Sequence, residues 1–369
     1  MTLTFRNRID VTLSVADQLI VGVDIQPRTR PPLERLFAGK PAEMLLAALP
    51  RLFSLCAGAH QVALLSALEA ARGEQAAPST RHRRIQAVLA ERFAELMRGL
   101  LIASMADNRS VAQPVQRLLQ AIASLQTPSD ADAPLQSRAA TLSQIKMGMV
   151  ALGIGWPAEP VLPGTPLASM MDAARKAADD GGWSHMPAEH DILSAADDGA
   201  IVTRLIDVGS AFAEAPELDG RVPETGVWAR YAERHQLASA GPVERLSAKI
   251  AEIAELLRLI EAGEAEAAAA DDPHAVASYG LGPRRGAAAV ECARGRLHHA
   301  IELDAHGTVS RFEYLAPTEW NFHPRGPVVR SLTGVALRGT VDRHAVHTMV
   351  GSFDPCVGYH LAFRGMADA

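Results

Sequence analysis

The spacing of the apolar residues changes twice along the chain, and this change limits the folds open to it. Over residues 9–25 apolar and polar positions alternate, with a break at 16–18, which is typical of a strand hairpin. From Pro41 the apolar residues recur at three and four positions, which is typical of amphipathic helices. After Ala287 the alternation returns, and the turn at 304–307 predicts a second hairpin. We therefore predict an α+β, mainly helical fold: a helical bundle with small strand hairpins from both termini.

The order of these segments predicts how the chain is organised. Strand-rich segments at 1–40 and 287–316 flank a helical segment at 41–265, whose clearest amphipathic helices span 85–101 and 243–260. We therefore expect residues 1–369 to form a single interwoven domain, in which the two ends meet around the helices.

Charge and cysteine content exclude several classes of protein. The net charge is -6 and the basic residues are dispersed, so no nucleic-acid surface is predicted. No apolar run is long enough to span a bilayer, and the amino terminus lacks the apolar segment of a signal peptide. The three cysteines are too few and too widely spaced for a disulfide scaffold, which fits a reducing compartment. We expect a cytoplasmic protein without a membrane span.

Two of the cysteines stand at predicted helix starts. The run Asp354–Cys356 places aspartate at an N-cap and proline at the first helical position, so Cys356 is expected in the first turn. Ser54 is a suitable N-cap for a helix that places Cys56 in its first turn, with His60 four residues later on the same face. The helix dipole is expected to lower the pKa of both thiols and favour the metal-binding thiolate. Inert cysteines buried in apolar helices are the competing interpretation.

Four runs in the sequence carry motifs. They are R-x-F-S-x-C-x-x-x-H at 51–60, E-C-A-R-G-x-L-x-H at 291–299, P-T-x-W-N-x-x-P-R at 317–325 and D-P-C-x-x-Y-x-x-A at 354–362. In this order they resemble motifs of the large subunit of nickel–iron hydrogenases. That family has cysteine and glycine at the positions of Phe53 and Ser54, and cysteine and histidine at those of Tyr359 and Ala362. Half of the family's four cysteines are therefore replaced here.

The resemblance assigns roles to the residues that remain. In the enzyme, four cysteines bind nickel, and the second of each pair also bridges to an iron that carries two cyanides and one carbon monoxide. By position, Cys56 matches an iron-bridging cysteine, Cys356 a nickel-terminal one, and Arg294 the arginine beside the diatomic ligands. Two thiolates cannot complete the nickel site, so neither nickel nor hydrogenase activity is expected. The shortened, cysteine-poor pattern looks like the accessory HupK/HoxV family, which is implicated in assembling the iron–cyanide–carbonyl unit.

The resemblance leads to one hypothesis, a scaffold that is not an enzyme. It would hold the iron–cyanide–carbonyl fragment transiently during maturation of an uptake nickel–iron hydrogenase. The partners implied are a HypC-type chaperone, a HypD-type scaffold and the large-subunit precursor. The expected metal ligands are Cys56 and Cys356, with Cys292 a weaker candidate, and the residues expected to contact the cofactor are Arg294, Glu291 and His60.

Other interpretations of the whole protein stay open. The chain is alternatively a metal-free chaperone or docking mimic of the large subunit, which binds maturation proteins or the small subunit. A redox switch through a Cys56–Cys356 disulfide is a third alternative.

Single residues also have alternatives. Arg294 alternatively forms a salt bridge with Glu291 or with a surface carboxylate, and Cys292 is alternatively a small buried residue. For His298 and His299, one packed and one solvated ring is the alternative to metal binding. Two further sequence features have an ordinary alternative. The loop with His185 and His190 is either a metal or partner surface or an ordinary loop, and the spacing of His344 and His347 is either that of a metal site or incidental.

Overall fold

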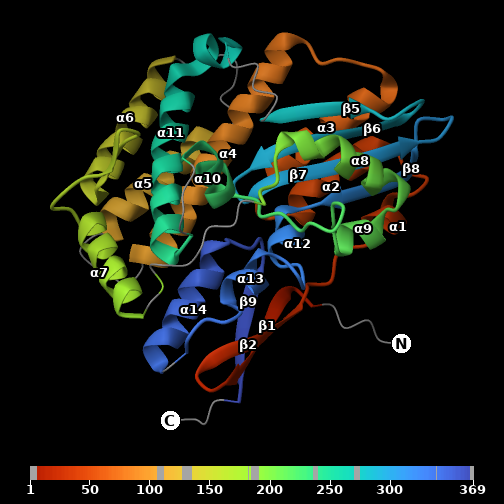
Figure 1. The fold of residues 1–369 in the computed structure, drawn as a ribbon. Coiled ribbons are helices and arrows are strands. Elements are labelled where there is room, and N and C mark those ends of the chain that lie inside the picture. The colour runs from red at the N-terminus through yellow and green to blue at the C-terminus, as the bar shows by residue number, and fades with distance from the viewer. Residues whose placement is uncertain are drawn as a thin grey trace.

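Long helices form a bundle on one side of the protein, at the left of Figure 1. The computed structural model describes residues 6–105, 112–126, 135–181, 183, 191–235, 240–269, 275–337 and 339–365. The bundle helices are α4 (Pro78–Met105), α5 (Ala112–Gln126), α6 (Leu135–Leu152), α7 (Pro166–Gly181) and α11 (Pro242–Ala269). Phe93 of α4 and Ile253 of α11, both on predicted apolar faces, are fully buried in one core cluster. The spacing of apolar residues therefore identified the helices correctly.

A four-stranded antiparallel sheet lies beside the bundle. It consists of β5 (Val276–Gly280), β6 (Arg285–Cys292), β7 (Gly295–Leu303) and β8 (Val309–Leu315), in that order. It begins at Val276, upstream of the predicted boundary at 287, because β5 pairs along β6.

Helices cover both faces of this sheet, as Figure 1 shows. They are α2 (Ala42–Leu52) and α3 (Ala57–Arg72) on one face, and α8 (Asp198–Asp207) and α9 (Ser210–Glu214) on the other. Successive strand residues face opposite sides, so Ala288 joins the cluster under α2 and α3, and Ala287 joins the cluster under α8 and α9.

The two ends of the described chain meet in a second, three-stranded sheet. Its order is β2 (Leu19–Gln26), β1 (Arg8–Ala16) and β9 (Gly358–Arg364). The pair β1–β2 is the predicted antiparallel hairpin, and β9 adds to β1 in parallel. The predicted final helix after Asp354 is wrong, because the backbone groups from Gly358 onward bond to β1 instead.

Shorter elements complete the described fold. They are α1 (Leu33–Phe37), β3 (Ile154–Trp156), β4 (Glu159–Val161), the 3₁₀ helix Ala195–Asp197, α10 (Val227–His235), α12 (Pro317–Asn321), α13 (Pro327–Leu332) and α14 (Thr340–Ser352). None of the helices among the described residues is both long and apolar enough to cross a membrane.

Candidate functional site

All three cysteines line one cavity of about 420 Å³. Cys56 comes from the start of α3, Cys292 from the end of β6, and Cys356 from the segment that leads into β9. His60 and Arg294 line the same cavity. Tertiary structure therefore brings the two ends of the sequence together with the β6–β7 turn, and none of the cysteines is in a disulfide.

Cys56 occupies the N-cap of α3 in a left-handed conformation, with φ 56° and ψ 31°. Cys56 therefore precedes the first turn of α3 rather than lying in it, and its side chain makes no capping hydrogen bond. The predictions that Cys56 lies in the first turn and that Ser54 is the N-cap are both wrong. The cap comes from α4 instead, where the Glu91 carboxylate accepts hydrogen bonds from the backbone N–H groups of Gly58 at 2.7 Å and Ala59 at 2.8 Å. The Glu91 carboxylate thus occupies the positive end of the α3 dipole that was expected to stabilise the Cys56 thiolate.

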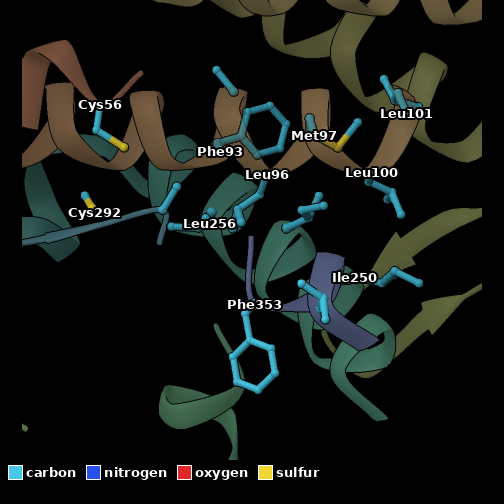
Figure 2. Close-up of a cluster of buried hydrophobic side chains, with 14 of the residues drawn as sticks. Cys56, Phe93, Leu96, Met97, Leu100, Leu101, Ile250, Leu256, Cys292 and Phe353 are labelled. Carbon is cyan, nitrogen blue, oxygen red and sulfur yellow. The ribbon is translucent and has the colours of Figure 1, made fainter. Parts of the chain in front are cut away.

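The buried thiols of Cys56 and Cys292 interact with each other. Figure 2 shows their side chains at one end of the buried apolar cluster, beyond Phe93 and Leu96. The hydrogen bond with Cys292, together with burial, raises the pKa of Cys56 well above its usual value. The same bond lowers the pKa of Cys292. Burial beside a second thiol therefore acts against the Cys56 thiolate that the helix dipole was expected to favour.

Cys356 lies in a bend rather than in a helix. Its backbone N–H donates to the Thr318 hydroxyl oxygen at 3.2 Å, which joins the carboxyl-terminal motif to α12. Burial raises the pKa of the Cys356 thiol, although Arg28 acts in the opposite direction. The predicted lowering is wrong here as well, because Cys356 does not stand at the start of a helix and burial is the largest influence on its pKa.

Arg294 lies between a thiol and two carboxylates. Its Nη1 is 3.3 Å from Cys56 Sγ and 3.3 Å from Glu95 Oε2, and its Nη2 is 3.8 Å from Asp354 Oδ1. Burial opposes the charge, but Asp354, Cys56 and Glu95 outweigh it and raise the pKa of Arg294. A buried guanidinium beside a thiol is a suitable hydrogen-bond donor for an anionic ligand in the cavity.

Glu291 is not among the residues that line the cavity. It pairs with Arg230 and, at 3.4 Å, with Arg296, so the alternative partner considered for Arg294 is wrong. Arg230 also donates to the backbone carbonyls of Cys292 at 3.5 Å and Ala293 at 3.4 Å. Glu291 therefore acts through Arg230 and helps to fix the turn that carries Cys292 and Arg294.

His60 faces the cavity, but one of its ring nitrogens is engaged. Its Nδ1 lies 2.9 Å from Nε2 of His299, and its ring stacks on Phe53 with a centroid distance of 3.6 Å. Burial, and then His299, lowers the pKa of His60 well below its usual value, so the ring is neutral. Phe53, which stands at a cysteine position of the enzyme family, is thus packed as an aromatic partner. At the other replaced position, the Tyr359 hydroxyl donates to the His347 carbonyl oxygen at 2.9 Å.

The remaining histidines do not assemble a metal site by themselves. His298 and His299 are both fully buried, because β7 is covered on both faces, so the expectation of one solvated ring is wrong. His298 bonds to Asp198 at 2.9 Å. His185 and His190 lie outside the described residues. Within the described ranges, no group of three or more His, Cys, Asp or Glu side chains is arranged to bind a metal ion. His344 and His347 therefore do not form such a group with a third side chain.

Three residues at the site were missed in the sequence. Glu91 and Glu95 are four positions apart, so they share one face of the predicted helix. This spacing is a signal in the sequence for two carboxylates beside the apolar face. Arg28 lies between prolines in the 27–32 run, where nothing in the local pattern indicates that it turns inward to the cavity.

Comparison with known proteins places this site in a family. The family model for nickel-dependent hydrogenases matches residues 212–359. The hydrogenase expression/formation protein HupK of Bradyrhizobium diazoefficiens is 49% identical, and the match covers 99% of both chains. HoxV of Cupriavidus necator is 30% identical, and the match covers 90% of this chain and 91% of that protein. The chain belongs to the HupK/HoxV family.

Solved structures agree with this assignment at the level of the fold. The Ni-Fe-Se hydrogenase from D. vulgaris Hildenborough superposes with a TM-score of 0.65 at 15% identity, covering 93% of this chain and 94% of that one. An NAD+-reducing [NiFe]-hydrogenase gives a TM-score of 0.57 at 16% identity, covering 92% and 93%. This HupK/HoxV protein therefore has the hydrogenase large-subunit fold, and the predicted fold class is confirmed.

Proposed function

We propose that this HupK/HoxV protein is a scaffold in the maturation of a nickel–iron uptake hydrogenase. It holds the iron–cyanide–carbonyl fragment transiently and transfers it to the large-subunit precursor. The observation that carries this proposal is the single cavity on which Cys56, Cys292, Cys356 and Arg294 converge. The fragment is cargo, so the protein needs to bind and release it without changing it.

The chemistry of the cavity supports this cargo. Thiolates suit iron, and cyanide and carbon monoxide supply the ligands that the protein lacks, so two thiolates are enough. Cys56 and Cys292 already interact as a pair, and Cys356 provides a third thiol from another wall. Arg294 is placed to donate to a cyanide nitrogen. With Phe53 and Tyr359 at the other two family positions, the four thiolates for nickel are not available from these motifs.

The proposal implies where the protein works and with which proteins. We place it in the cytoplasm, because three unpaired thiols are suited to a reducing compartment. A HypC-type chaperone and a HypD-type scaffold are the proposed donors of the fragment, and the large-subunit precursor is the proposed acceptor. Its kinship with hydrogenase expression/formation proteins supports these partners.

A second candidate is a metal-free docking mimic of the large subunit. The shared fold, with a TM-score of 0.65, favours it, because a protein of this shape can present large-subunit surfaces to maturation proteins or to the small subunit. Such a protein would not need its thiols.

Cysteine variants separate the two functions. The protein is co-expressed with the maturation machinery, purified without oxygen and examined by infrared spectroscopy for cyanide and carbon monoxide bands. The scaffold predicts these bands in the unmodified protein and in a Ser310→Ala control, which changes an exposed serine outside the cavity lining. It predicts their loss, together with loss of hydrogenase maturation, in Cys56→Ala/Cys292→Ala/Cys356→Ala. Full maturation by the triple variant would favour the docking mimic and refute the scaffold.

A further inference from the structure

A second arginine reaches the cavity from a wall other than that of Arg294. Arg28, in the segment between β2 and α1, lines the cavity together with Cys356. Its side chain is only 9% exposed, and its Nη2 donates to Glu319 Oε1 at 2.9 Å. Its Nε is buried without a hydrogen-bond partner among the described residues. A buried N–H of a charged group without an acceptor is costly, so the position is suited to a ligand that supplies one.

The charges around Arg28 do not balance. Arg30 is also 9% exposed, and its Nε lies 4.0 Å from the same Glu319 oxygen, while its guanidinium packs 4.4 Å from the Tyr314 ring centroid. Two buried cations thus share the carboxylate of Glu319. Glu313 also faces Arg30, which lies behind the cavity lining, but burial raises the pKa of Glu313 to about 7, so this carboxyl offsets the two cations only in part. A surplus of positive charge therefore remains beside Arg28.

The wall that carries Arg294 is different, because carboxylates already surround it. Glu95 and Asp354 both pair with Arg294, and these two acids have further cationic partners in Arg98 and Lys249. Three cations therefore face Glu95, Asp354 and the nearby Glu91, which leaves no excess of positive charge.

The cargo needs such an excess. Iron(II) with two cyanides and one carbon monoxide is neutral, and two thiolate ligands make the bound complex a dianion. Burying a net negative charge is costly unless cations pair with it. A cyanide nitrogen accepts hydrogen bonds well, so an uncompensated buried guanidinium is its natural partner.

We propose that Arg28 is a second cargo-binding residue, which donates a hydrogen bond to one terminal cyanide from the Cys356 side of the cavity, while Arg294 donates to the other. This inference rests on the proposed scaffold function. It makes the cavity selective for a complex with two anionic acceptor ligands, since each has its own arginine.

Infrared spectra of Arg28 variants test this assignment. Arg28→Gln removes the charge, Arg28→Lys retains it with a different donor geometry, and Arg72→Lys changes an exposed arginine that pairs with Glu43 far from the cavity lining. The expected result is a shift of one cyanide band in Arg28→Gln, a smaller shift of that band in Arg28→Lys, and an unchanged spectrum in Arg72→Lys. The other cyanide band is expected to move only in Arg294→Lys.

The outcomes distinguish this inference from the function on which it rests. If the unmodified protein shows no cyanide or carbon monoxide bands, the scaffold function and the role of Arg28 are both wrong. If the unmodified protein shows the bands and they are identical in both Arg28 variants, the role of Arg28 is wrong and the scaffold stands. If Arg28→Gln does not fold, as judged by urea unfolding, unmoved bands in Arg28→Lys are sufficient to overturn the assignment.

Discussion

Removal of the Glu91 carboxylate is expected to destabilise the start of α3 and to make the Cys56 thiol more accessible to labelling reagents. In Glu91→Ala, the N–H groups of Gly58 and Ala59 lose acceptors at 2.7 and 2.8 Å. Each unsatisfied buried donor costs roughly 1–3 kcal/mol, so we expect a loss of about 2–4 kcal/mol in the free energy of unfolding. Burial raises the pKa of Glu91, which shows that desolvating the charge already offsets part of its benefit. Glu91→Gln keeps one oxygen acceptor and avoids that desolvation, so a loss of about 1 kcal/mol is expected.

Urea unfolding measures these losses, and thiol labelling locates them. Glu255→Ala is the matched control, because the pair of Glu255 on α11 with Arg258 is exposed to solvent and its loss should change stability by less than about 0.5 kcal/mol. Labelling of Cys56 in native buffer, followed by mass spectrometry, should be faster in Glu91→Ala than in the control. An unfolding midpoint and a labelling rate equal to those of the control would refute the capping role of Glu91.

Three further predictions concern the stability of the fold. Asp198→Asn should cost about 3–5 kcal/mol in urea unfolding because it breaks a buried ion pair with Arg296. Burial opposes ionisation of Asp198, but its hydrogen-bond partners outweigh burial and lower its pKa. The contribution of Asp198 to the free energy of unfolding is therefore present above about pH 4 and declines as the pH falls. A stability profile that is flat in acid would contradict this. Burial raises the pKa of Glu313 to about 7, so stability should fall as pH rises from about 4.5 to 7, and melting temperatures of Glu313→Gln should lack that fall. Gly153→Ala should cost about 2–4 kcal/mol, because φ is +100° and the new Cβ would lie 2.1 Å from Thr165 Oγ1; a change below about 0.5 kcal/mol in urea unfolding would show that this turn is not strained.

The helices and hairpins were predictable because their signals are local. The apolar spacing over 85–101 and 243–260 identified α4 and α11, and the turn at 304–307 identified the β7–β8 hairpin. The final segment shows the limit of this approach. Asp354 and Pro355 favour a helix locally, but the chain that follows gains a complete strand ladder with β1, and that partner is far away in the sequence.

The sequence motifs selected some residues of the candidate cavity, but not the chemistry of those residues. Motif positions selected Cys56, Cys356 and Arg294, which the fold brings to one cavity. The pKa of a thiol, however, depends on which groups surround it in three dimensions. Glu91 from another helix occupies the N–H groups that were expected to act on Cys56, and Cys292 becomes its hydrogen-bond partner. The sequence places both carboxylate and thiol near these apolar segments, but it does not show which partner each contacts in the folded protein.

Transfer of labelled cargo tests the central claim most directly. The protein is loaded by co-expression in the presence of ¹³C-cyanide precursor, purified without oxygen and mixed with unlabelled large-subunit precursor, and the two proteins are separated and examined by infrared spectroscopy. The scaffold predicts that isotope-shifted cyanide bands decrease in this protein and appear in the large-subunit precursor. Labelled bands that never form on this protein, or that remain on it while the precursor stays empty, would contradict the account.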